Sequence, residues 1–113
     1  MKQTEILLTI KLHQKLFIDP KRVRLLKEIK ECGSINQAAK NAKVSYKSAW
    51  DHLEAMNKIS PKPLLERNIG GKNGGGTSLT TYAEGLLQLY DLLEQTQEHA
   101  FHILQGETIP LNS

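Results

Sequence analysis

The sequence predicts a mainly α-helical fold with a small β component, and three observations lead to that prediction. Helix-capping patterns recur along the chain, a glycine-rich stretch separates two short segments of strand character, and the C-terminal part has regularly spaced apolar residues. The length of 113 residues corresponds to about one domain with a small core.

The N-terminal part predicts a strand followed by a helix. A strand is expected over residues 6–18, because apolar and polar residues alternate from Leu8 to His13. Asp19 and Pro20 then form a typical helix start, in which Asp19 is the N-cap and proline takes the first helical position. Gly33 suits the C-terminal cap of this helix, where glycine readily adopts a positive φ.

Two further capping patterns predict two more helices in close succession. Ser34-x-x-Gln37 is a capping box, and Ser45 caps a third helix. The inward face of this third helix is expected to contain Ala49, Leu53 and Met56. Because the second cap follows the first after eleven residues, a tight turn joins the two helices, which is the helix-turn-helix layout.

A β-hairpin is predicted after the third helix. Leu64–Arg67 and Thr77–Leu79 have strand character, and residues 70–76 between them are mostly glycine. A hairpin in this place is a wing, so the expected fold is a winged helix-turn-helix. A nucleotide-binding loop is the weaker interpretation, because Lys72 is followed by Asn73 instead of Ser or Thr and the stretch leads into a strand.

The last predicted helix is long and amphipathic. It is expected to start with Thr81 as its cap, because Thr81-x-x-Glu84 is another capping box. Its heptad-spaced stripe consists of Tyr82, Leu86, Leu89, Leu93, Thr96, Ala100 and Ile103. A second apolar stripe lies alongside, so one stripe can pack on the domain while the other contacts a partner. We expect a homodimer; one wide core-facing stripe in a monomer is the alternative.

These segments divide the chain into three parts. Residues 1–79 form the expected winged helix-turn-helix DNA-binding domain, residues 80–105 the dimerisation helix, and residues 106–113 a tail or the start of a linker. All fifteen Lys and Arg lie between Lys2 and Lys72, so residues 1–78, with seven acidic residues, carry a charge of +8. Residues 79–113 have five acidic and no basic residues, which gives −5. A basic body with an acidic C-terminal part indicates a polyanionic partner, and we expect double-stranded DNA.

Other classes of protein find little support in the sequence. Ile6–Leu8 is too short for the apolar core of a signal peptide, and no apolar run approaches the roughly 20 residues of a membrane span, so a cytoplasmic protein without membrane contact is expected. Cys32 is the only cysteine, which rules out an intrachain disulfide and a cysteine-based zinc site. His99 and His102 share a helical face, but the sequence places no third ligand, so no metal site is expected. No catalytic arrangement stands out, and an enzyme is not expected.

The first turn of the third helix is the expected DNA reader, because recognition helices present their N-terminal side chains to base edges. Its candidates are Ser45, Tyr46, Lys47, Ser48, Trp50 and Asp51. Trp50 is equally well explained as a core residue, and Asp51 either accepts from a cytosine amine or holds a neighbouring lysine. Further contacts to DNA are expected at the start of the second helix and on the wing, from Ser34, Asn36, Gln37, Arg67, Lys72 and Asn73.

Long runs of the chain resemble the N-terminal DNA-binding domain of the bacterial molybdate-dependent transcriptional regulators, the ModE family. The runs that carry the resemblance are ILLTIKLHQKLFIDPKRVRLLKEI, GSINQAAKNAKVSYKSAWDHLEAMN, LLERNIGGKNGGGTSLT and LLQLYDLLEQ. More remotely, SINQAAKNAKVS, LLER and LTTYA are similar to the LysR-type regulators. Lys43 departs from the general helix-turn-helix pattern, in which many members carry a glycine at the turn.

The resemblance implies a dimer that binds an inverted-repeat operator, with the third helices in successive major grooves and the wings on adjacent DNA. In the full-length family, C-terminal β-barrel domains bind molybdate or tungstate and thereby switch DNA binding, typically repressing molybdate-transport genes. Those domains have no counterpart in this sequence, so no cofactor is expected in this chain. The chain is expected to be a fragment ending near the family's linker or a natural short form.

Two alternatives to a DNA-binding regulator remain from the sequence. Winged helices also serve as protein-interaction adaptors, and the acidic helix over residues 80–105 would then be the working surface. An oxyanion-sensing or nucleotide-binding enzyme would require this chain itself to bind such a ligand.

Overall fold

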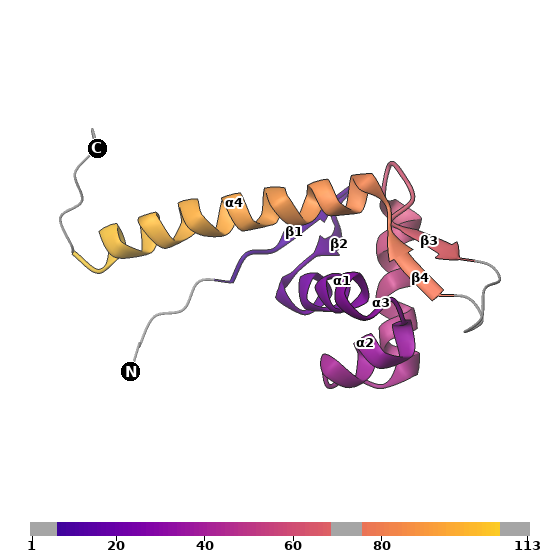
Figure 1. The fold of residues 1–113 in the computed structure, drawn as a ribbon. Helices are drawn as coiled ribbons and strands as arrows, with labels where there is room; N and C mark the ends of the chain where they lie inside the picture. The colour runs from indigo at the N-terminus through magenta and orange to yellow at the C-terminus, as the bar shows by residue number, and fades with distance from the viewer. Residues whose placement is uncertain (1–6, 69–75, 107–113) are drawn as a thin grey trace.

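The computed structural model describes residues 7–68 and 76–106, and it is mainly α-helical with two small antiparallel hairpins (Figure 1). The elements in chain order are β1 (Ile10–Leu12), β2 (Lys15–Ile18), α1 (Pro20–Cys32), α2 (Ile35–Asn41), α3 (Tyr46–Ile59), β3 (Leu65–Asn68), β4 (Gly76–Leu79) and α4 (Thr81–Leu104). The predicted fold class, a winged helix-turn-helix with a small β component, is confirmed.

The prediction of one N-terminal strand over residues 6–18 is wrong. The segment instead folds back on itself, because β1 and β2 pair antiparallel around a turn at His13 and Gln14. Both turn residues have a positive φ, 52° and 66°, which is the backbone of the tight turns that best match the twist of a hairpin. Neither residue is a glycine, so the sequence carries no obvious turn signal there.

The predicted ends of α1 are confirmed. Asp19 is the N-cap, and its carboxylate accepts a hydrogen bond of 2.8 Å from the backbone N–H of Arg22. Pro20 takes the first helical position, where its missing N–H removes no helical hydrogen bond. Gly33 ends the helix with a φ of 68°, and its N–H donates to the carbonyl of Ile29.

Serine caps begin α2 and α3, as the sequence predicts. The Ser34 hydroxyl accepts from the Gln37 N–H at 3.2 Å, and the Ser45 hydroxyl accepts from the Ser48 N–H at 3.0 Å. The return half of the capping box is not formed at α2, because the Gln37 amide donates to the Asn41 side chain instead. The caps hold the two helices in the helix-turn-helix arrangement.

The wing hairpin is formed by β3 and β4, with Arg67 paired opposite Thr77. Compared with the predicted segments, β3 is shifted by one residue and β4 begins one residue earlier, which is the usual uncertainty of element ends. Leu64 lies outside the strand and is buried in the core. The N–H of Thr77 donates to the carbonyl of Gly33 at 2.9 Å, so the hairpin is fastened to the turn between α1 and α2.

The hydrophobic core lies between α1, α2 and α3 and is closed by β2, β4 and the start of α4. The inward face predicted for α3 is confirmed, because Ala49, Leu53 and Met56 are buried. From α4, Ala83, Leu87 and Tyr90 join this core. The core therefore fixes the face of α3 that remains outside.

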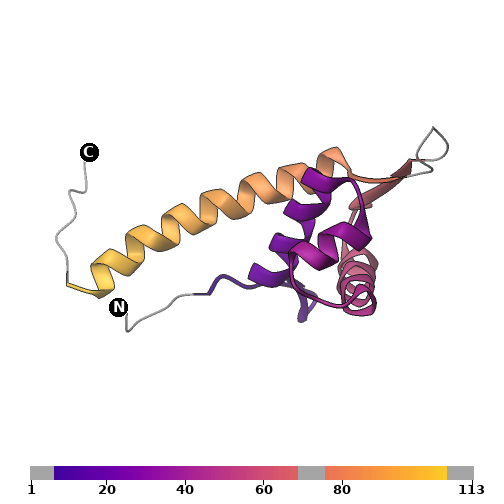
Figure 2. The ribbon, with the colours of Figure 1, turned by 60° about the horizontal axis from the view of Figure 1, so that its bottom comes forward.

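α4 extends well beyond the body that holds its first half (Figures 1 and 2). Its N-cap is Thr80 and not Thr81, because the Thr80 hydroxyl accepts from the Ala83 N–H and donates to the Pro63 carbonyl. This second bond, to a residue distant in sequence, determines which of the two adjacent threonines caps the helix. Ion pairs from α1, Lys27–Asp91 and Lys30–Glu84, each 3.3 Å, hold the helix along its first half.

Candidate nucleic-acid interface

The first turn of α3 is exposed on the side away from the core. The Lys47 side chain is 85% exposed, and Tyr46 is 52% exposed although it is a large aromatic residue. Ser45 is exposed at the cap and Ser48 is half-buried. An exposed helix start that carries a cation, hydroxyls and an aromatic ring has the donors and apolar surface with which base edges are read.

Asp51 holds Lys47 on this helix. The Lys47 ammonium lies 2.9 Å from the Asp51 carboxylate, one turn further along α3. Of the two interpretations that the sequence leaves open for Asp51, the structure shows the ion pair with a neighbouring lysine. The Lys47 charge is therefore partly neutralised in the free protein.

Trp50 connects α3 to the wing. It is half-buried and packs against the core, and Tyr46 meets its ring edge-on with centroids 6.2 Å apart. The Arg67 guanidinium of β3 lies over the same ring, 5.1 Å from its centroid. Such cation–π contacts contribute about 0.5–1 kcal/mol at exposed sites. Trp50 thus has a core-facing side and a side that contacts two candidate DNA-binding residues.

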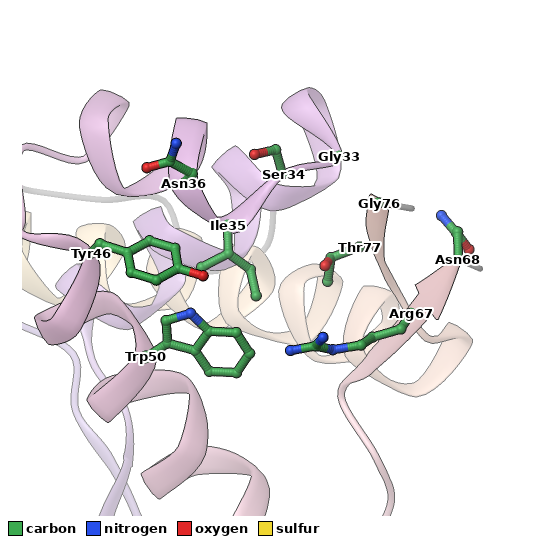
Figure 3. A pocket seen from close by; sticks show the side chains of 10 residues that line it. All are labelled: Gly33, Ser34, Ile35, Asn36, Tyr46, Trp50, Arg67, Asn68, Gly76 and Thr77. Carbon is green, nitrogen blue, oxygen red and sulfur yellow. The ribbon is translucent and has the colours of Figure 1, made fainter. Parts of the chain in front are cut away.

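An open hollow of about 480 Å³ lies between the start of α2, the start of α3 and the wing (Figure 3). Its lining comprises Gly33, Ser34, Ile35, Asn36, Tyr46, Trp50, Arg67, Asn68, Gly76 and Thr77. Arg67 reaches across it from β3 toward the ring of Trp50, and the Tyr46 hydroxyl also points into it. Among the described residues of this lining, Arg67 is the only charged one, so they contribute a positive and no negative group.

The predicted α2 residues differ in their roles. Ser34 uses its hydroxyl as the helix cap, Asn36 is exposed at the rim of the hollow, and the exposed Gln37 is hydrogen-bonded to Asn41. Asn41 also donates to Glu28 of α1 at 3.0 Å, so Gln37 belongs to a polar chain that joins α1 and α2. Asn36 is the α2 side chain best placed for an added contact.

A buried arginine fixes α3 to the N-terminal part of the fold. Arg22 of α1 donates to the ring Nδ1 of His52 at 3.1 Å and to the carbonyls of Leu16 and Phe17. Burial and the adjacent positive charge of Arg22 lower the pKa of His52, so the ring is held neutral and accepts the hydrogen bond. These bonds help to fix the outward direction of the first turn of α3.

Comparison with known proteins places this arrangement in a family. Residues 20–84, from α1 to the first turn of α4, match the family described as bacterial regulatory helix-turn-helix protein, lysR family. The chain belongs to this family. The lysR-family match covers the helix-turn-helix, the wing and all described residues around the hollow. The family match confirms the prediction of a regulatory helix-turn-helix protein, as opposed to an enzyme.

Individual relatives agree with the resemblance inferred from the sequence. The chain is 88% identical over 113 residues to the transcriptional regulator ModE of Haemophilus influenzae, covering all of this chain and 44% of that protein. It is 57% identical over 112 residues to the DNA-binding transcriptional dual regulator ModE of Escherichia coli K12, covering 98% and 43%. It is 49% identical over 73 residues to the molybdenum transport protein ModE of Azotobacter vinelandii, covering 65% and 27%. The lysR-family chain thus spans less than half the length of these relatives.

The apolar stripes of α4 in this lysR-family chain have different surroundings. Residues predicted to contact a partner include the half-buried Tyr82, Leu86 and Leu93 and the exposed Leu89, Thr96, Ala100 and Ile103. Tyr82 and Leu86 also pack against the core of their own chain. The surface near the stripe includes Leu92, which is 58% exposed. Exposed apolar side chains therefore remain along this helix.

The described part of the lysR-family chain adds residues that sequence reasoning missed. Asn68 and Thr77 line the hollow, and the signal was available, because a hairpin centred on the glycine stretch places Thr77 opposite Arg67. Lys72 and Asn73, predicted as wing contacts, lie outside the described residues. Within residues 7–68 and 76–106, no group of three His, Cys, Asp or Glu side chains is placed to hold a metal ion. No helix of that same part has the length and hydropathy to cross a membrane.

Proposed function

We propose that this chain is the DNA-binding part of a molybdate-responsive transcriptional regulator, which binds an inverted-repeat operator as a homodimer in the cytoplasm and represses molybdate-transport genes. The family match and the names of the relatives support this, since they include a DNA-binding transcriptional dual regulator and a molybdenum transport protein, both called ModE. The charge of +8 over residues 1–78 supports a polyanionic partner.

The observation that carries the proposal is the exposed first turn of α3 beside the wing. Tyr46, Lys47 and Ser48 contact bases in the major groove, while Arg67 of β3 contacts the adjacent backbone. Lys72 and Asn73 add contacts from the tip of the wing. Asn36 and Ser34 lie at the edge of this face and contact phosphate.

Dimerisation follows in the proposal from the exposed apolar side of α4. Leu89, Leu92 and Ile103 are 46–58% exposed, and a second copy of the same stripe would cover them. A two-fold dimer matches an operator with two-fold symmetry, because each protomer then reads one half-site. Molybdate binding is assigned to the part of such regulators that this chain does not span.

Binding to a duplex over a series of salt concentrations tests the proposal. We expect the logarithm of affinity to fall steeply with the logarithm of salt, with a slope of about −4 or steeper, because several phosphates are contacted. The double variant Lys47→Ala/Ser48→Ala should lose about 10- to 100-fold in affinity for a selected sequence, with a smaller loss on random DNA. Unchanged sequence preference in this variant would show that α3 is not the reader.

Calorimetry with molybdate tests the other half of the proposal. The chain alone should give no binding at micromolar concentrations, because the molybdate site is assigned elsewhere. Micromolar binding to the chain itself would overturn that assignment.

A further inference from the structure

We propose that the hollow between α3 and the wing seats one phosphate group of the DNA backbone, that the Arg67 guanidinium binds this phosphate, and that Trp50 is the positioning residue that holds Arg67 in place. The proposal rests on the proposed function, because it names the chemical group that occupies part of the same DNA-binding face.

The hollow is large enough to hold a phosphate group. Its volume of about 480 Å³ leaves room for a phosphate with surrounding water, since each water takes about 30 Å³. The hollow is open to solvent, so a backbone phosphate can enter without separating the helices from the wing. Its lining includes the apolar side chains of Ile35 and Trp50, and the hydrogen bond from Thr77 to Gly33 ties its two sides together.

Its charge also fits an anion. Among the described residues, Arg67 is the only charged one in the lining, and no carboxylate forms an ion pair with it. The neighbouring Glu66 lies on the other face of β3, where it lines a separate hollow with Lys62 and Tyr82. An exposed guanidinium without a carboxylate partner retains its donors for a bidentate bond to phosphate oxygens.

The direction of Arg67 distinguishes a phosphate contact from insertion into the minor groove. Its side chain reaches back over the Trp50 ring, 5.1 Å from the centroid, and does not extend outward past the hairpin (Figure 3). The Tyr46 hydroxyl points into the same space and supplies a second donor. The flat face of Trp50 thus defines where the positive charge lies relative to the first turn of α3.

The main experiment uses duplexes with single neutral phosphates. A bound sequence is first selected from a random pool with the 113-residue chain, and one methylphosphonate is then moved along each strand. We expect one position per half-site at which the neutral group lowers the affinity of the wild-type chain for the duplex about fivefold at 0.15 M salt. This is the effect expected from the loss of one phosphate contact, which has a salt slope of about 0.9. The Arg67→Gln variant should bind the unmodified duplex about fivefold more weakly than the wild type. A methylphosphonate at that one position should not weaken its binding further.

Matched variants separate positioning from stability. Trp50→Leu keeps an apolar side chain against the core but removes the aromatic face, so it should lose the same methylphosphonate sensitivity, whereas Trp50→Phe should retain most of it. In the Arg67→Gln background, Trp50→Leu should cause no further loss at that position, because the two residues act as one unit. Lys15→Gln, which removes an exposed charge from β2, is the control and should keep the sensitivity. Melting temperatures identify any variant that fails to fold.

Three results would contradict the inference. If Arg67→Gln remained as sensitive as the wild type at every backbone position, the hollow would hold no phosphate. If it lost discrimination between A·T and G·C pairs with unchanged phosphate sensitivity, Arg67 would read the minor groove. If Trp50→Leu kept the sensitivity, Trp50 would not position Arg67. Absence of salt-dependent DNA binding by the wild-type chain would instead contradict the proposed function, so the two failures are distinguishable.

Discussion

Lys43 occupies the turn between α2 and α3 with a φ of 60°, a conformation that side chains with a Cβ adopt at a cost of about 1–2 kcal/mol. The turn is closed by the Lys43 N–H, which donates to the Lys40 carbonyl, and by the Val44 N–H, which donates to the Ala39 carbonyl. These bonds hold the residue in its left-handed conformation. The turn of the helix-turn-helix is therefore formed without a glycine, which would remove the conformational cost of the positive φ.

Lys43→Gly should stabilise the fold. Glycine removes the cost of the positive φ but loses more freedom on folding, so the expected net gain is about 0.5–1 kcal/mol in the free energy of unfolding. Urea denaturation measures it. Lys43→Ala is the control, because it removes the same charge and keeps the backbone cost; equal stabilities of the two variants would show that the turn stores no such energy.

His52 should make the stability depend on pH. Its pKa is lowered by burial and by Arg22, so below about pH 6.5 the unfolded chain takes up a proton that the folded chain does not. Stability is therefore full above that pH and falls as the pH drops toward the lowered value. Urea midpoints between pH 5 and 7.5 check this.

The matched variant for that experiment is His52→Gln, which offers an oxygen to Arg22 but does not titrate. It should flatten the pH dependence of the unfolding free energy over the same window. If the wild type and this variant gave parallel curves, the titration of His52 would not be the cause.

Among the candidate site residues, Trp50 shows most clearly where sequence reasoning ends. Helical spacing predicts that Ala49, Leu53 and Met56 face inward, and they do, because that pattern is local. The ring of Trp50 is instead shared between the core and Arg67, which lies 17 positions away on another element. Such a contact depends on how the wing packs, and neither residue's local sequence encodes it.

At the scale of elements, α3 combines a rigid position with an internally paired charge. Its inward face is held by the core, and its middle is held through His52 and Arg22. The first turn carries Lys47, whose charge is partly neutralised by Asp51 at 2.9 Å. Lys47 has to leave this carboxylate before it contacts DNA. The ion pair with Asp51 therefore lowers the affinity of the helix for any phosphate.

Asp51→Asn should raise the affinity for random DNA more than for a selected sequence. The variant frees Lys47 and removes a carboxylate that repels phosphate, so the salt slope should steepen by about 1. Fluorescence anisotropy with random and selected duplexes measures both. Glu54→Gln removes an exposed carboxylate one turn further along α3, where no described cation pairs with it, and should change the slope less. Equal effects of both variants would mean that only the overall charge matters.

The elements themselves were predicted where their ends are encoded locally. Asp19, Ser34 and Ser45 cap the helices that their positions indicate, because a capping bond spans only three residues. The N-terminal hairpin was missed because His13 and Gln14 lack a glycine signal. The N-cap of α4 is predicted at the wrong threonine, because Pro63, which is distant in sequence, selects Thr80. Local patterns in the sequence predict where a helix is capped. They do not show which of two similar neighbouring residues is selected by contacts with distant parts of the chain.

At the scale of the whole molecule, the protein is elongated, with extents of 55 × 30 × 29 Å. The 24-residue α4 accounts for the long dimension (Figure 2). Its exposed apolar side chains include Leu89, Leu92 and Ile103. In the proposed dimer these exposed side chains form the contact, while the face of α4 that is held by Lys27 and Lys30 packs on the body.

Leu89→Glu should dissociate the proposed dimer. A carboxylate buried in an apolar contact lacks a partner, so we expect the dimer dissociation constant to rise on the order of 100-fold. Sedimentation equilibrium measures the mass, and binding to a duplex with two half-sites should weaken in parallel. Gln88→Glu adds the same charge at the adjacent exposed position, about 100° around the helix, and should have little effect. A monomeric wild type, or an unaffected Leu89→Glu, would contradict a dimer through this stripe.

The junction between β4 and α4 consists of Thr80 alone, which is bonded to Pro63 and caps the helix. No flexible connection separates the wing from α4, so a change in the crossing angle of two paired α4 helices would carry both wings and both α3 helices with it. Two reading helices on one face of DNA must lie about 34 Å apart, one helical turn. In the proposed dimer, the crossing angle of the two α4 helices would therefore set the distance between the two α3 helices, and with it the operator spacing that the dimer can bind.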